Sequence, residues 1–102
     1  MLKFDALKIV KDGLSITTSG TSVAVALPTN AAGQPAKTIR VSCPNSAHYA
    51  YVLPGKSGVV ATTASVAVGN FSDVILDVSG CTHIAHLQGS TNAIVQISPT
   101  EW

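Results

Sequence analysis

Short runs in which apolar and polar residues alternate one by one recur along this chain. Residues 22–27, 38–43, 72–78 and 92–98 show this period of two most clearly, and 49–53 and 83–88 resemble them. Successive side chains of a β-strand point to opposite faces, so the alternation indicates strands with one buried and one exposed side. Residues 14–18 and 59–61 are shorter candidates.

The apolar positions of the four clearest runs predict much of the core. We expect twelve side chains to point inward: Val23, Val25, Leu27, Ile39, Val41, Cys43, Val74, Leu76, Val78, Ala93, Val95 and Ile97.

Turn-forming residues separate the runs. Pro, Gly, Asn and Ser gather at 28–30, 33–35, 44–46, 54–55, 69–70, 79–80 and 89–90. These residue types favour turns because they supply positive φ, a fixed φ or a local side-chain hydrogen bond. About eight short strands at this spacing predict an all-β antiparallel β-sandwich, jelly-roll-like in outline. No helical pattern lies between them, which argues against a parallel α/β sheet. The length fits one domain over residues 1–102.

Residues 1–12 are compatible with a short helix or with a strand. A helix of this length is not stable alone. We expect either a first strand or an N-terminal arm that reaches a neighbouring subunit.

Charge is scarce in this sequence. Charged residues make up 11% of the chain, against about 25% in an ordinary soluble domain. A surface so poor in charge is easier to bury against a partner, which predicts self-association as a dimer or trimer. The alternative is a monomer whose surface is rich in Ser and Thr.

The charge balance also bears on other partners. The net charge is +1 and the lysines are scattered, so we expect no nucleic-acid binding. No apolar run is long enough to cross a membrane. The first residues do not resemble a signal peptide, which predicts a protein made in a cytoplasm.

Reactive residue types cluster only at Cys81, His83 and His86. On a strand the two histidines fall on opposite faces and cannot share one metal ion. No local motif supplies the third group of a catalytic triad or an oxyanion site. We therefore expect no enzyme, no metal and no cofactor; Cys81 and Ile84 should pack while the histidines sit at a sheet edge or interface.

Other candidate groups have structural interpretations as well. Cys43 and Cys81 form either a disulfide or two thiols, with thiols the default in a reducing compartment. Asp73 and Asp77 share a strand face about 13 Å apart, too far for a glycosidase pair. Tyr49 shares a strand face with Tyr51, and two such rings are more often core and rim than a sugar platform.

Five stretches in the second half of the chain carry a resemblance. They are residues 50–52, 58–63, 66–69, 76–85 and 97–102, which read AYV, GVVATT, VAVG, LDVSGCTHIA and ISPTEW. In this order they resemble small structural proteins from the head gene modules of tailed bacteriophages. The likeness is confined to residues 50–102.

The resemblance implies a β-sandwich or jelly-roll-like cement protein. Such a decoration protein would stabilise a phage capsid by bridging subunits of the major capsid protein, on the capsid surface of a virion assembled in the host cytoplasm. Aromatic and large apolar residues near chain ends often anchor interfaces, so the candidate contact residues are those at the two termini. These interface candidates are Leu2, Phe4, Leu7 and Trp102.

Other functions remain open from the sequence. A head–tail or tail component is the nearest alternative. A carbohydrate-binding module would need Tyr49, Tyr51 and Trp102 exposed together. A small enzyme would need a pocket that joins Cys81 to a histidine, and an intracellular β-sandwich adaptor needs neither.

Overall fold

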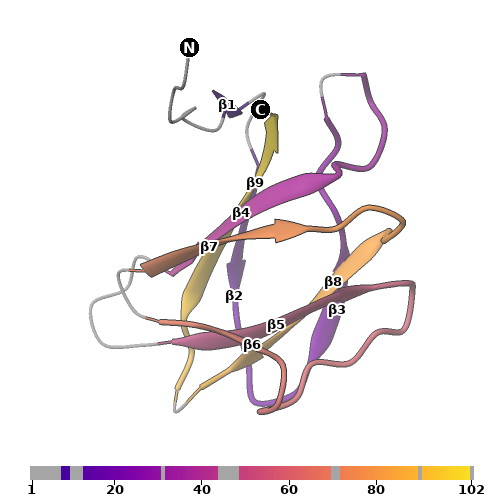
Figure 1. The fold of residues 1–102 in the computed structure, drawn as a ribbon. Coiled ribbons are helices and arrows are strands. Elements are labelled where there is room, and N and C mark those ends of the chain that lie inside the picture. The colour runs from indigo at the N-terminus through magenta and orange to yellow at the C-terminus, as the bar shows by residue number, and fades with distance from the viewer. Residues whose placement is uncertain are drawn as a thin grey trace.

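The computed structural model describes residues 8–9, 13–30, 32–43, 49–69, 72–89 and 91–101. All regular secondary structure in these ranges is β-strand (Figure 1). The strands are β1 (Lys8–Ile9), β2 (Leu14–Thr17), β3 (Val23–Ala26), β4 (Thr38–Cys43), β5 (Ala50–Gly55), β6 (Val66–Val68), β7 (Ser72–Asp77), β8 (His83–Gln88) and β9 (Ile94–Glu101).

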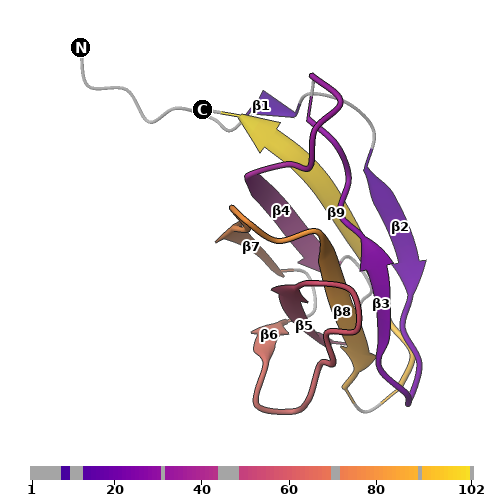
Figure 2. The same ribbon diagram turned by 90° about the vertical axis from the view of Figure 1, so that its right-hand side faces the viewer.

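The strands form two antiparallel sheets that face each other (Figure 2). Sheet A has the order β1-β9-β4-β7, and β2 pairs with β9 on the same side as β1. Sheet B has the order β3-β8-β5-β6. The all-β sandwich expected from the alternation is confirmed.

Strand pairing in this sandwich is nested. β5 pairs with β6, β4 with β7, β3 with β8 and β2 with β9, each time antiparallel. The pairs alternate between the two sheets, so the chain folds like one long hairpin rolled up on itself.

The core lies between the two sheets and follows the period of two. Ile39, Val41 and Cys43 are fully buried on the inner side of β4, and Val95 and Ile97 are buried on β9. Sheet B contributes Ala50, Val52, Val68 and Ile84. The inward positions predicted from the sequence all belong to this core or pack against it, except Val23, which is 44% exposed at the edge.

A second, smaller cluster of buried side chains lies on the outer side of sheet B. The register places Leu53, Ala85 and Ala24 side by side there, and Ala85 is completely buried. Residues 56–65 form the segment that joins β5 to β6 (Figure 1). The backbone N–H of Ala61, itself buried, donates to Ser22 Oγ at the start of β3, so the segment crosses the sheet.

This crossing segment corrects two expectations. Residues 59–61 are not a strand but part of the covering segment, and the sixth strand is Val66–Val68 instead. Residues 54–55 are not a turn, since β5 continues through Pro54 and Gly55 opposite Ile84 and His83. Gly55 is needed there because a side chain at this position would collide with Val59.

Lys8 and Ile9 form a two-residue first strand against Thr100 and Glu101. The rest of the segment 1–12 lies outside the described residues.

Candidate functional site

The cluster of Cys81, His83 and His86 does not converge in space. His83 is half-buried on the outer side of β8, whereas His86 points into the sandwich and is only 3% exposed. The prediction that the two histidines lie on opposite faces is confirmed. His83 contacts the hydroxyl of Thr82, with 2.8 Å between Nδ1 and Oγ1.

The expectation that both histidines sit at an edge or interface is wrong for His86. β8 lies between β3 and β5, and His86 sits in one inner row with Val52 and Val23. Its Nδ1 is buried and has no hydrogen-bond partner. Burial lowers the pKa of His86 below its ordinary value, because the surroundings solvate the charged ring poorly.

The two carboxylates of β7, Asp73 and Asp77, do not act as a pair, because each has its own hydrogen-bond donor. Asp73 accepts a hydrogen bond from Arg40 Nε at 2.6 Å across to β4. Asp77 accepts from the backbone N–H of Ser79, and this hydrogen bonding lowers the pKa of its carboxyl. Both lie on the outer face of the strand, as predicted, with Ile75 between them.

The two cysteines are not joined in a disulfide. Cys43 is buried at the end of β4, opposite Ser72, and Cys81 is half-buried just before β8. Within the described ranges, no group of three or more His, Cys, Asp and Glu side chains could hold a metal ion. The same ranges contain no helix that could span a membrane.

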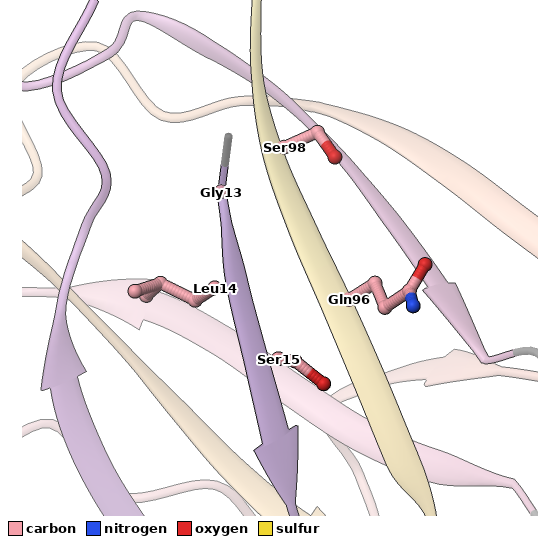
Figure 3. Close-up of a pocket in the computed structure, with 5 residues that line it drawn as sticks. All are labelled: Gly13, Leu14, Ser15, Gln96 and Ser98. Carbon is pink, nitrogen blue, oxygen red and sulfur yellow. The ribbon is translucent and has the colours of Figure 1, made fainter. Parts of the chain in front are cut away.

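A small polar hollow lies on the outer face of sheet A, where β2 begins beside β9. Its volume is about 180 Å³, and its lining is shown in Figure 3: Gly13, Leu14, Ser15, Gln96 and Ser98. The three polar side chains point to one side of the sheet and Leu14 to the other. A side chain at Gly13 would collide with the carbonyl of Ile97, so glycine permits the two strands to meet here.

The two aromatic residues that the structure describes belong to the other sheet. Tyr49 and Tyr51 belong to the β5 region of sheet B and pack edge to face, with ring centroids 5.8 Å apart. Both are half-buried, so they do not form a flat open platform for a sugar ring. The structure thus separates Tyr49 and Tyr51 from the polar groups of the hollow, while Trp102 lies outside the described residues.

A larger hollow of about 440 Å³ opens at one end of the sandwich. Its lining residues are Gln34, Pro35, Ala36, Lys37, Lys56, Gly80, Cys81 and Thr82. Lys56 Nζ donates to the carbonyl of Gly80, which holds one wall in place. Among the described lining residues, no carboxylate or imidazole lies beside the thiol of Cys81.

The outer face of sheet A presents mostly uncharged side chains. It is formed by Ser15, Thr17, Thr38, Arg40, Ser42, Asp73, Ile75, Asp77, Ile94, Gln96 and Ser98. Arg40 is the one cation in this set, and Asp73 neutralises it. Ile75 and Ile94 are 44% and 39% exposed. Sequence reasoning missed both, although each occupies an outward position in an alternating strand.

The four terminal residues predicted as interface anchors, Leu2, Phe4, Leu7 and Trp102, lie outside the described residues.

Comparison of the chain with protein-family models, with curated proteins and with solved structures found no match.

Proposed function

We propose that this chain is a structural protein of a phage virion that decorates the capsid and stabilises it by binding across neighbouring major capsid subunits. The observation that carries the proposal is the outer face of sheet A. Eight of the eleven residues named for it are uncharged, Arg40 is paired with Asp73, and the side chains of Ile75 and Ile94 are exposed. The central parts of protein interfaces are depleted of charge in the same way.

The nested strand pairing supports the same function. We propose that the sandwich is jelly-roll-like, an architecture that viral capsid domains and lectins share. An architecture alone does not decide between these two roles. The separation of the polar hollow from Tyr49 and Tyr51 favours the capsid role over sugar binding.

A cement protein would act through binding energy alone. Many identical copies on a symmetric shell add their contacts, so each contact can be weak while the shell as a whole gains stability. This role requires a rigid sandwich with a broad docking face. It does not require the cysteines or the histidines.

The test begins with virions of the phage that encodes the chain. Mass spectrometry of purified, separated heads and tails should find the protein in heads. Heads lacking it should release their DNA at a lower temperature, and adding the purified protein back should restore the wild-type release temperature. Recovery with tails only, or absence from the virion, would overturn the proposal.

The docking face is tested with matched variants. The double variant Ile75→Glu/Ile94→Glu should bind empty expanded shells at least about tenfold more weakly, because each glutamate must be desolvated in the contact. Ala67→Glu, on the exposed outer side of β6 in sheet B, is the control and should bind like the wild type. Equal binding by all three proteins would show that sheet A is not the docking face.

A further inference from the structure

One edge of sheet B lacks the features that normally keep strand edges apart. β3 ends the order β3-β8-β5-β6 and has a neighbour on one side only, among the described residues. Natural edge strands carry charges, prolines or bulges that block pairing with another chain. β3 reads Val-Ala-Val-Ala, and residues 13–36 around it contain no charged residue at all.

The hydrogen-bond register shows which backbone groups of β3 are unused. The N–H of Leu27 donates to the carbonyl of Thr82, which fixes the phase of the β3–β8 ladder. In an antiparallel pair, the residues that bond to the neighbour alternate with residues whose N–H and C=O point away. Val23 and Val25 therefore bond to β8, whereas Ala24 and Ala26 direct their backbone groups to the open edge.

The side chains at this edge also leave apolar surface uncovered. Val23 occupies an inner position in the same row as Val52 and His86, yet it is 44% exposed. Ala26 is exposed as well. Val23 is thus the exposed member of this inner row, at the β3 edge and beside the buried ring of His86.

We infer that two copies of this chain associate through their β3 edges, so that sheet B continues from one subunit into the other around a two-fold axis at Ala24. In this register Ala24 lies opposite its own copy and Ala26 opposite Ser22, so every outward backbone group on Ala24 and Ala26 finds a partner. Shifting the strands by two residues would place Ser22 opposite Pro28, which has no N–H to donate.

The charges on the edge strands favour dimer pairing through β3 rather than through the opposite edge of the sandwich. β7 is the outermost strand of sheet A on that side, and it carries Asp73 and Asp77. Pairing β7 with its copy around Ile75 would place these aspartates opposite each other, which is destabilising. β3 brings no charge to either side of the contact. β6 is also uncharged, but it is only three residues long.

This inference stands on the edge strand and does not require the capsid role. The first experiment is sedimentation equilibrium of the full chain at concentrations up to about 1 mM. We expect a monomer–dimer equilibrium. A monomer throughout would overturn the inference, and so would a higher oligomer without a dimer.

Variants locate the contact. Ala24→Lys should raise the dimer dissociation constant at least about tenfold, because it places two ammonium groups together on the axis. Ala26→Lys, at a more exposed position, should weaken the dimer too and covers the case in which Ala24→Lys fails to fold. Ala67→Lys on β6 is the matched control and should dimerise like the wild type. A dimer unaffected by the β3 variants would refute the β3 edge.

Cross-linking tests the register directly. In a Cys81→Ser background, Ala24→Cys should form a covalent dimer with a short bis-maleimide, since the two thiols would meet at the axis. Ala67→Cys in the same background should not. A cross-linked product with Ala67→Cys alone would place the contact at the other edge and refute the inference. Because Ile75 and Ile94 lie on sheet A, their glutamate variants should remain dimeric even where capsid binding is lost.

Discussion

His86 should make the folded protein sensitive to mild acid. Its ring is 3% exposed on the inner side of β8, and Nδ1 has no hydrogen-bond partner. Val52 and Val23 flank it in the same row of sheet B, so no charged group stands beside it there. Burial therefore lowers the pKa of His86 below the ordinary value of 6.5.

The direction of the pH effect follows from this shift. Because the pKa is lower in the folded state, the unfolded chain binds more protons at mildly acidic pH. The free energy of unfolding should be constant above the pKa of the unfolded histidine and fall as the pH drops below it. One proton taken up on unfolding gives a slope of up to about 1.4 kcal/mol per pH unit.

The substitution His86→Leu isolates this contribution. Leucine has no polar atom to bury, and an unpaired buried polar group costs about 1–3 kcal/mol. At pH 7.5 the variant should be as stable as the wild type or more stable. Between pH 7 and pH 5 its stability should vary less than that of the wild type.

Urea unfolding followed by circular dichroism at several pH values measures both effects. His83→Leu is the matched control, since His83 lies half-buried on the other face of the same strand. It should keep the wild-type slope. The reasoning is refuted if His86→Leu also keeps that slope, or if it destabilises the protein by more than about 2 kcal/mol at pH 7.5, which would mean that the ring makes a favourable contact.

Three further predictions concern packing and the covering segment. Ile39→Ala should lower the free energy of unfolding by about 2–5 kcal/mol, because Ile39 is fully buried. Ile75→Ala, on the exposed face, is the control and should change the free energy of unfolding by less than about 0.5 kcal/mol in the same urea assay. Gly13→Ala should lower the thermal midpoint, since the new methyl group would push β2 away from the carbonyl of Ile97; an unchanged midpoint would mean that β2 and β9 are not so close. Ser22→Ala should speed hydrogen exchange at the amide of Ala61, which loses its acceptor, while the amide of Val41 in β4 should exchange at the wild-type rate.

The strands were predictable where one face is buried and the other is exposed. β4 is the clearest case, since Ile39, Val41 and Cys43 are all buried and the residues between them are not. Residues 59–61 look similar, but periodicity cannot distinguish a strand from a segment lying across a sheet. Nothing local marks Ala61 as the residue that crosses to Ser22, because this contact joins residues far apart in the sequence.

The site was less predictable for the same reason. Strand alternation placed His83 and His86 on opposite faces, but it could not show which of the two faces is the core. The exposed isoleucines and the β3 edge depend on strand order, and many orders fit the same spacing of strands and turns. The absence of charged residues from positions 13–36 can be seen in the sequence. It bears on strand pairing only once β3 is known to be the edge strand of its sheet.

The nested pairing also sets the order in which this chain can fold during synthesis. β9 comes last in sequence among the described strands, yet it lies in the interior of sheet A, between β4 on one side and β1 and β2 on the other. β9 must therefore leave the ribosome before β2 can form the pairing seen among the described residues. Contacts between residues so far apart form slowly, and until they form the inner faces of β2 and β4 remain exposed. A messenger truncated shortly before β9 should thus yield a product that proteases remove, so that only full-length copies accumulate in the cell.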